Sequence, residues 1–365
     1  MIAIENRAQR TGPGHVLDPH QLEFGKNYTP NWFVCEWRDH AWRNARVEPV
    51  TPIIMHPAAI MLHYAQGIFE GLKAYRHPDG KIALFRPEMN ARRMNHSARR
   101  MDMPEISEQL FLDAIRELVD TERDWTPPEP GSLYIRPTMV ATEPYIGVRG
   151  ASEFLFYILT LPSGAYFKES KGLDQSVRVL VTESVKRAAP GGTGGIKAAA
   201  NYAITLKVIN EAKAKGCAQV LFLDARGQGL VEELGGMNAV FVIDGKLVTP
   251  PASDTTLAGV TRDSLILLGR DLGLTVEERP VSIHEVLDGI AKGTTTEAMA
   301  CGTAAVIAAI GSFLLEDGRV VTVGDGQAGP VARRLYDHLV GIQYGHQPDR
   351  FGWVEEVPVR AAAHS

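Results

Sequence analysis

Short apolar runs alternate with longer amphipathic stretches through the first half of the chain. Three runs have the length and the β-branched or aromatic content of strands: 81–85 (KIALF), 133–139 (LYIRPTM) and 154–161 (FLFYILTL). Two stretches between the first and second runs predict helices: 87–101 and 107–123. The pattern predicts a smaller N-terminal α/β domain over residues 1–165.

The pattern changes in the second half. Residues 162–175 (PSGAYFKESKGLDQ) combine Pro, Gly, Lys and Asp with little periodicity, which is typical of an interdomain connection, and we place that connection at 166–176. Strands are then predicted at 177–182, 219–223, 239–243 and 304–310. Helices are predicted at 199–214, 261–272, 283–291 and 330–339. Together they predict a larger C-terminal mixed α/β domain over residues 177–365.

Composition narrows the classes of function. The chain has 365 residues, enough for two domains, and 45% of them are hydrophobic. A formal charge of −5 leaves no basic surplus for a nucleic-acid backbone, so we expect small-molecule substrates. The three cysteines form no CxxC pair, which argues against a disulfide framework and a structural metal site. Neither a signal-peptide pattern nor an apolar run of membrane-spanning length occurs, so we expect a cytoplasmic protein with no membrane partner.

One lysine stands out by its position. Residues 190–202 (PGGTGGIKAAANY) join a Gly-rich turn to the start of a predicted helix, with Lys197 at the junction. A phosphate-binding Walker loop needs Gly before the lysine and Ser or Thr after it, but Ile196 and Ala198 stand there. A dinucleotide-binding fingerprint fails as well, because the third glycine is missing at the required offset. A lysine without further signals is usually a solvated surface residue.

The segment around Lys197 resembles the lysine segment of branched-chain aminotransferases, which has GGTG, two further residues, Lys, three small residues and Asn-Tyr. Six more segments resemble the same family in the same order: 62–76 (LHYAQGIFEGLKAYR), 85–94 (FRPEMNARRM), 133–137 (LYIRP), 230–238 (LVEELGGMN), 258–263 (AGVTRD) and 300–305 (ACGTAA). One short motif is a weak signal, whereas seven collinear motifs over residues 20–345 are a specific one.

The resemblance implies the α+β fold of type IV pyridoxal-phosphate enzymes, like that of D-amino-acid aminotransferase, with the active site in the cleft between two domains. It implies that Lys197 holds pyridoxal 5′-phosphate (PLP) as a Schiff base and shuttles a proton, because an amine forms an imine with the cofactor aldehyde. Glu233 matches the carboxylate that keeps the pyridine nitrogen protonated, with its neighbour Glu232 as the alternative. Further implied cofactor contacts are Arg93 to the phosphate, Tyr202 to the 3′-oxygen, and Val260, Thr261 and Thr303.

A mostly apolar substrate pocket is also implied. Its residues by resemblance are Tyr28, Tyr64, Phe69, Tyr134, Arg136 and Ala304, together with Ile146 and Val148 from the other subunit of a homodimer. The implied reaction is ping-pong transamination of branched-chain L-amino acids (Leu, Ile, Val) with 2-oxoglutarate, which yields branched 2-oxo acids and L-glutamate.

Two alanines depart from the family pattern. Ala199 and Ala200 replace the usual Gly-Gly before Asn-Tyr, so an aminotransferase for an unusual β-branched or aromatic amino acid is the main alternative. D-amino-acid aminotransferases and aminodeoxychorismate lyases share the fold, but they are generally shorter and lack the FEGLKAYR segment and the GGTG loop. A binding protein without a cofactor is disfavoured because the implied cofactor residues, Lys197 and Glu233 among them, are intact.

Overall fold

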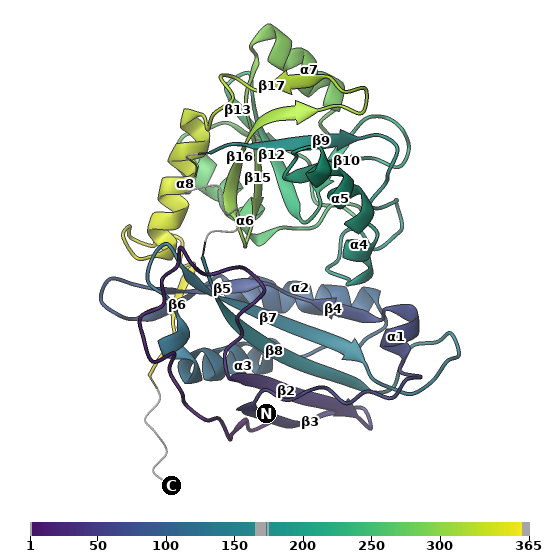
Figure 1. The fold of residues 1–365 in the computed structure, drawn as a ribbon, viewed down its shortest axis with the longest axis vertical. Helices are drawn as coiled ribbons and strands as arrows, with labels where there is room; N and C mark the ends of the chain where they lie inside the picture. The colour runs from purple at the N-terminus through teal and green to yellow at the C-terminus, as the bar shows by residue number, and fades with distance from the viewer. Residues whose placement is uncertain (1, 165–172, 174, 360–365) are drawn as a thin grey trace. The chain divides into compact units, whose positions relative to one another are not determined.

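Two compact units make up the chain, Met1–Tyr166 with Gly341–Ser365 and Phe167–Val340 (Figure 1). The computed structural model describes residues 2–164, 173 and 175–359. Most of the connection predicted at 166–176 therefore lies outside the described residues. The last 25 or so residues, expected in the C-terminal domain, belong to the first unit instead.

The first unit is built on a mainly antiparallel sheet. Its strands in spatial order are β1 (Glu5–Asn6), β3 (Ala41–Pro49), β2 (Asn31–Arg38), β8 (Phe154–Ser163), β7 (Ser132–Ala141), β5 (Leu72–Arg76), β6 (Ile82–Phe85) and β18 (Val354–Glu356), and β4 (Gly67–Phe69) pairs with β7. Its helices are α1 (Ile60–Tyr64), α2 (Pro87–Arg100), α3 (Glu108–Thr121) and the 3-10 helix η1 (Arg123–Trp125). Each element predicted in the first half is confirmed to within about three residues.

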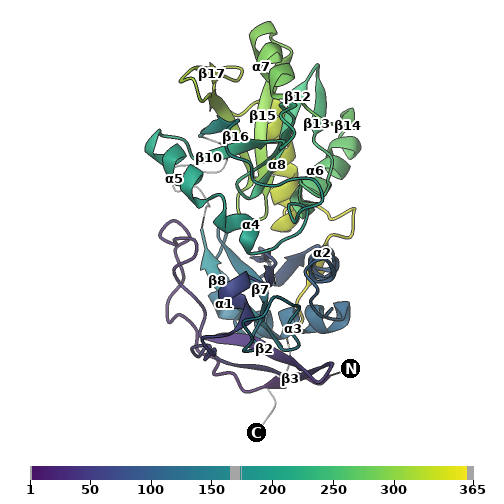
Figure 2. The same cartoon turned by 90° about the vertical axis from the view of Figure 1, so that its right-hand side faces the viewer.

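The two faces of this sheet differ in chemistry. Alternate strand residues such as Ile135 and Phe156 point into the main core, where they meet Met94 of α2 and Phe111 of α3. Figure 2 shows both helices on the same side of the sheet. Tyr134, next to Ile135 on β7, points to the opposite face because side chains alternate along a strand.

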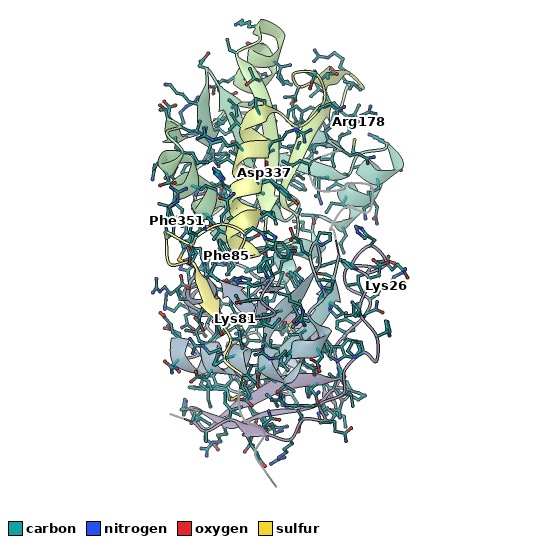
Figure 3. All side chains as sticks on the ribbon, turned by 90° about the vertical axis from the view of Figure 1, so that its left-hand side faces the viewer. Lys26, Lys81, Phe85, Arg178, Asp337 and Phe351 are labelled. Atoms are coloured by element: carbon teal, nitrogen blue, oxygen red, sulfur yellow. The ribbon has the colours of Figure 1, made fainter. Side chains whose placement is uncertain are left out.

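The end of the chain supplies an edge strand to this sheet. Strand β18 pairs antiparallel with β6, with Val354 opposite Phe85. The Trp353 ring packs edge-on against Phe85, with centroids 5.6 Å apart, and stacks on Phe351 at 4.1 Å. Figure 3 labels Lys81, Phe85 and Phe351 around this edge strand. Lys81 forms an ion pair with Glu356 at 3.0 Å. These contacts explain why the C-terminal segment belongs to the first unit.

The second unit has its own sheet. Its strands in spatial order are β11 (Val231–Leu234), β10 (Gln219–Leu223), β9 (Val177–Thr182), β16 (Val306–Leu314), β15 (Thr295–Gly302), β12 (Met237–Ile243), β13 (Lys246–Thr249) and β14 (Val276–Glu278), and β17 (Val320–Thr322) pairs with β16. Its helices are α4 (Ala200–Ala203), α5 (Leu206–Ala214), α6 (Val260–Asp271), α7 (Ile283–Lys292) and α8 (Pro330–Gln343), which runs into the first unit.

A tight hairpin closes part of this sheet. Strand β11 pairs with β12 as well as with β10, so the strands from β11 round to β12 form a ring. The hairpin turn is Gly235-Gly236, a sequence that suits a two-residue connection. Its register places Glu233 opposite Asn238.

Two elements of the second unit differ from the prediction. The helix expected at 199–214 is broken between α4 and α5, where the Thr205 hydroxyl donates to the Tyr202 carbonyl at 2.8 Å and competes with a helical N–H for that acceptor. The strand expected at 304–310 begins only at Val306, whose φ of 61° follows a turn that contains Thr303 and Ala304. The other predicted strands and helices of this unit are confirmed.

Candidate active site

The glycines before Lys197 allow its turn to pack directly on another backbone segment. The Gly195 N–H donates to the Asp254 carbonyl at 2.7 Å. A Cβ at Gly195 would collide with the Ser253 carbonyl oxygen, and one at Gly194 would lie 2.8 Å from the Thr255 Cα. The Gly-rich sequence is therefore required by close backbone approach.

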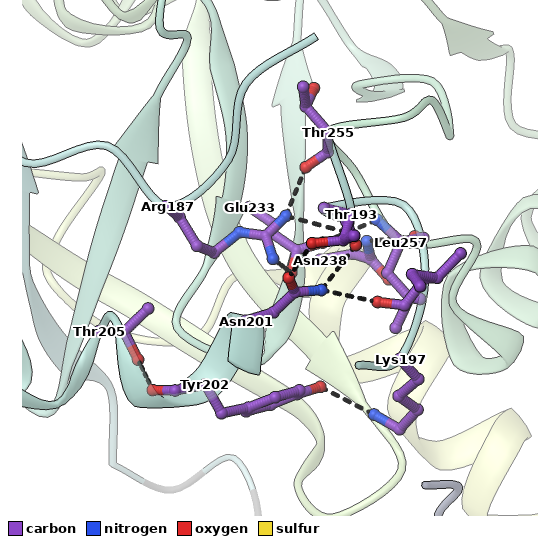
Figure 4. Close-up of polar contacts among 12 residues, drawn as sticks. Arg187, Thr193, Lys197, Asn201, Tyr202, Thr205, Glu233, Asn238, Thr255 and Leu257 are labelled. Carbon is purple, nitrogen blue, oxygen red and sulfur yellow. Dashed lines mark hydrogen bonds and ion pairs between the residues drawn. The ribbon is translucent and has the colours of Figure 1, made fainter. Parts of the chain in front are cut away.

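Asn201 fixes the other side of the same turn. Its side-chain amide donates to the Thr193 carbonyl at 2.6 Å and to the Ile196 carbonyl at 2.9 Å, and it accepts from the Thr193 hydroxyl at 2.7 Å (Figure 4). The side chain is buried, so these bonds are formed largely out of water. Asn201 thus ties the turn to α4, which carries the next residue, Tyr202.

The structure brings Lys197 and Tyr202 together. The Lys197 Nζ donates to the Tyr202 Oη at 2.9 Å (Figure 4). Both residues are half-buried, so the amine is reachable and yet held in one orientation. A Cβ at Gly236 would lie 3.5 Å from the Tyr202 ring, which places the β11–β12 hairpin next to this pair.

Glu233 is a buried carboxylate with partners on both oxygens. Its Oε1 forms an ion pair with Arg187 at 3.1 Å, and its Oε2 accepts the Leu257 N–H at 2.9 Å. Asn238, opposite in register, donates to the Leu257 carbonyl at 2.9 Å. Glu232 is also buried, and burial raises the pKa of its carboxyl despite a hydrogen bond from Thr255.

The start of α6 lies beside these groups. Gly259 is the N-cap of α6, and no side chain caps the helix. A Cβ at Gly259 would collide with the Asn238 Oδ1, so the two residues are in direct contact. Val260 and Thr261 are buried in the first helical turn, which offers backbone N–H groups and the positive end of a helix dipole.

The turn after β15 belongs to the same part of the second unit. A Cβ at Gly302 would lie 3.7 Å from the Gly236 carbonyl, so this turn is adjacent to the hairpin tip. Thr303 and Ala304, which follow Gly302, are partly exposed. The predicted second-unit residues are thus gathered around one hairpin.

Predicted substrate residues of the first unit form a second group. The Arg136 guanidinium lies over the Phe69 ring at 4.7 Å from the centroid and donates to the Tyr134 Oη at 3.0 Å. Phe24, which the sequence analysis missed, packs edge-on against Tyr134 with centroids 4.9 Å apart. The three predicted residues lie together on the sheet face opposite the helices.

Arg93 has a carboxylate partner. Its Nε and Nη2 donate to the two oxygens of Glu70 at 2.7 and 2.8 Å, and Asn90 donates to the same carboxylate at 2.7 Å. Glu70 is fully buried and Arg93 nearly so. The arginine is held rigidly on α2, as a bidentate pair requires.

The other predicted first-unit residues are exposed. The Tyr28 hydroxyl donates to the Gly25 carbonyl at 3.1 Å, and the Tyr64 hydroxyl donates to the Ile146 carbonyl. Ile146 and Val148 are 60% and 88% exposed. None of these contacts joins them to Tyr134 or Arg136 in the described residues.

Arg187 is the main site residue that sequence reasoning missed. It follows β9, ten positions before Lys197, and has no motif to mark it. A carboxylate predicted to be buried beside the cofactor ring was a signal for a compensating cation or donor, but the sequence did not say which residue supplies it.

Other classes of site are not indicated. Within the described residues, no group of three or more His, Cys, Asp or Glu side chains is arranged to hold a metal ion. Among the described residues, no helix has both the length and the apolar character needed to cross a bilayer. All three cysteines are buried thiols, and burial raises the pKa of Cys35 and of Cys301 to about 12.

Comparison with known proteins points to one family. The model of the amino-transferase class IV family matches residues 67–313. The branched-chain-amino-acid transaminase 1 of Bacillus subtilis (strain 168) is 43% identical over 344 residues, which cover 93% of this chain and 95% of that protein. A branched-chain-amino-acid aminotransferase of Mycolicibacterium smegmatis is 45% identical over 338 residues, or 91% of each chain.

Solved structures agree. The branched-chain amino acid aminotransferase of Escherichia coli has a TM-score of 0.74 at 28% identity and covers 89% of this chain and 99% of its own. The enzyme from Thermobaculum terrenum in its PLP form also has a TM-score of 0.74 at 28% identity, with 91% of this chain and 100% of its own covered. With the fold and the family match together, the chain belongs to the class IV aminotransferases, in the branched-chain-amino-acid aminotransferase family.

Proposed function

We propose that this enzyme transfers the amino group of branched-chain L-amino acids (Leu, Ile, Val) to 2-oxoglutarate, with PLP held covalently by Lys197. The observation that carries the proposal is the Lys197–Tyr202 hydrogen bond of 2.9 Å in the same unit as the buried Glu233. The names of the relatives at 43–45% identity support the choice of substrate.

The side chains present fit PLP. An aldehyde needs an amine, which Lys197 supplies, and a pyridine nitrogen that is to remain protonated needs a buried anion, which Glu233 supplies. A phosphate dianion needs fixed N–H donors, and the start of α6 at Val260 and Thr261 has them. Gly236 and Gly259 leave room where a Cβ would meet Tyr202 or Asn238.

When bound, PLP supplies the electron sink that stabilises the negative charge left on the substrate α-carbon. The Lys197 amine would hold the cofactor and would move the proton taken from the substrate α-carbon. The Tyr202 hydroxyl orients the Lys197 amine through the observed hydrogen bond and also offers a donor to the 3′-oxygen. Glu233 would keep the pyridine nitrogen protonated by charge pairing.

First-unit residues have proposed roles that rest on the family resemblance. Arg93 is proposed to bind the cofactor phosphate, and its rigid pairing with Glu70 supports a fixed guanidinium there. Tyr134, Arg136 and Phe69 are proposed to contact the substrate, which their common position on one sheet face supports. Thr303 and Ala304 are the proposed counterparts in the second unit.

The first experiment is a covalent trap. PLP is added to the purified protein, the product is reduced with borohydride, and the peptides are analysed by mass spectrometry. We expect the phosphopyridoxyl group on the peptide that contains Lys197, and none in Lys197→Ala, whose turnover should fall by several powers of ten, since a covalent catalyst is lost. A label on another lysine, with Lys197→Ala fully active, contradicts the assignment.

The second experiment tests the substrate. Initial rates with 2-oxoglutarate are measured for L-leucine, L-isoleucine, L-valine, L-phenylalanine and D-leucine. We expect the three branched L-amino acids to react fastest. A preference for phenylalanine would still support an aminotransferase but would contradict branched-chain amino acids as its substrates. A preference for D-leucine would point to a D-amino-acid aminotransferase.

We also propose a homodimer, as the family resemblance implies. Exposed apolar side chains on the first unit support it, because Ile146 and Val148 are 60% and 88% exposed, and the Ile146 carbonyl accepts from the Tyr64 hydroxyl. Light scattering with size exclusion should give twice the monomer mass, and Val148→Asp should weaken the dimer.

We further propose that the protein functions in a reducing compartment such as the cytoplasm, which its buried free thiols support.

A further inference from the structure

A buried arginine links Glu233 to the turn that carries Lys197. The Arg187 side chain is 5% exposed, as is that of Glu233. Its Nη1 lies 3.1 Å from the Glu233 Oε1, and its Nη2 donates to the carbonyls of Gly194, at 3.3 Å, and of Thr255 (Figure 4). One guanidinium therefore contacts the carboxylate, the lysine turn and the segment on which that turn packs.

The ion pair sets the position and the charge of Glu233. A buried carboxylate costs several kcal/mol of desolvation unless a cation or donors compensate it. Here Arg187 compensates one oxygen, and the Leu257 N–H, at 2.9 Å, compensates the other. With both oxygens engaged, the carboxylate plane is fixed and its anionic form is favoured.

The neighbouring residue shows what burial does in the absence of such an ion pair. Glu232 is 6% exposed, comparable with Glu233, and one of its carboxyl oxygens, Oε2, is buried without a hydrogen-bond partner. Burial is the chief cause that raises the pKa of Glu232, although the Thr255 hydrogen bond and the Arg187 charge act in the other direction. A buried glutamate on the same strand, without a direct ion pair, therefore has a raised pKa even with the Arg187 charge nearby.

We propose that Arg187 is a positioning residue for the cofactor ring: it holds Glu233 as an oriented anion and fixes the distance from that anion to the Lys197 turn. This inference rests on the proposed function, because it needs Glu233 to meet the pyridine nitrogen. The ring of PLP is rigid, so the amine and the carboxylate that bind its two ends must be correctly spaced before it arrives. Arg187 provides that spacing through the Gly194 carbonyl.

The test is a double-mutant cycle on PLP affinity. The dissociation constant of PLP is measured by fluorescence quenching on apo-protein for Arg187→Gln, Glu233→Gln and the double variant. We expect each single change to weaken PLP binding about tenfold or more, since each breaks a buried pair. The double variant should bind PLP no more weakly than the single variant with the lower affinity, because both changes remove the same interaction.

Two further variants separate positioning from general stability. Arg187→Lys keeps a cation but not the forked donors, so it should recover part of the affinity lost in Arg187→Gln. Arg279→Gln is the matched control, because it removes ion pairs with Glu285, at 2.6 Å, and Glu277, at 3.2 Å, in the same unit. Its PLP affinity should equal that of the wild type.

Three results overturn the role of Arg187: wild-type PLP affinity in Arg187→Gln, losses that multiply in the double variant, or an equal loss in Arg279→Gln. If circular dichroism shows that Arg187→Gln does not fold, Arg187→Lys replaces it in the same cycle, with the same criterion. A wild-type protein that does not bind PLP at Lys197 contradicts the proposed function itself. Normal binding in the Arg187 variant contradicts only this inference.

Discussion

The Lys197 Nζ and the Tyr202 Oη lie 2.9 Å apart across the start of α4. Tyr202→Phe deletes this bond and leaves the ring in place. Because a hydrogen bond to a charged group contributes about 1.5–3 kcal/mol, we expect kcat with L-leucine and 2-oxoglutarate to fall about tenfold to a hundredfold.

The control for that variant is Tyr344, a buried tyrosine whose hydroxyl also forms hydrogen bonds. The Tyr344 hydroxyl donates to the carbonyls of Pro130 and Gly131 at 2.9 and 3.0 Å in the first unit. Tyr344→Phe should lower the free energy of unfolding but leave kcat near the wild-type value. Equal losses of rate in both variants would mean that the Tyr202 effect is structural.

Gly195→Ala should disturb the Lys197 turn. The added Cβ would collide with the Ser253 carbonyl, so either the turn or that segment must shift, at a cost of about 1–3 kcal/mol. We expect a lower melting temperature and weaker PLP binding. Gly12→Ala is the control, because its nearest atom, the Asp124 Cβ, is 3.5 Å away. A fully tolerated Gly195→Ala would show that the turn adapts freely.

Glu297 should stabilise the second unit by capping α8. Its two carboxylate oxygens accept the backbone N–H groups of Val331 and Ala332 at 2.9 and 2.8 Å. Glu297→Ala leaves these donors without the acceptor, and we expect the free energy of unfolding in urea to fall by about 1–3 kcal/mol. Asp325→Ala removes an exposed acceptor for the Gln327 N–H and should cost less than about 0.5 kcal/mol.

Glu122 should make the stability of the protein depend on pH. Its Oε1 accepts from the Asn31 backbone N–H and from the Asn31 side-chain amide at 2.8 and 2.6 Å. Burial raises the pKa of Glu122 from 4.5 to about 7, although these hydrogen bonds and the Arg10 charge act in the other direction. Between these two values the folded state keeps a proton that the unfolded state has released. Stability therefore falls as the pH rises through this window, and the loss is complete above pH 7.

Urea unfolding of the wild type and Glu122→Gln at about pH 5 and about pH 8 checks this expectation. Glutamine keeps the acceptor oxygen and cannot ionise, so the variant should gain stability over the wild type at the higher pH. The same pH dependence in both proteins would assign it to other groups.

The sequence predicted elements with clear periodicity and missed those defined by tertiary contacts. Strands such as β9 and β10 are apolar runs that are buried in a sheet, so local pattern and environment agree. Strand β11 (VEEL) was missed because its two central residues are glutamates, and the ion pair that permits the burial of Glu233 comes from Arg187, more than forty positions away. At the helix break, the Thr205 hydroxyl donates to the Tyr202 carbonyl, a contact that periodicity does not encode.

The residues of the site divide in the same way, into those that a sequence motif marks and those that only the tertiary fold brings into place. Lys197, Tyr202 and Glu233 were predicted because the segments that contain them resemble family motifs with fixed spacings along the chain. Phe24 and Arg187 belong to no such motif, and they reach Tyr134 and Glu233 only through the fold. Side chains that act on other side chains leave little trace in a single sequence.

The pairing of β18 with β6 bears on how the protein is made. The first unit consists of the beginning and the end of the chain, so the ribosome must finish the whole second unit before the edge strand of the first is available. During synthesis, one edge of β6 therefore stays unpaired until β18 has been made, and an unpaired strand edge is prone to aggregation. A fragment that ends near residue 166 would keep that edge permanently, so the N-terminal unit is better expressed with the C-terminal segment joined to it by a short linker.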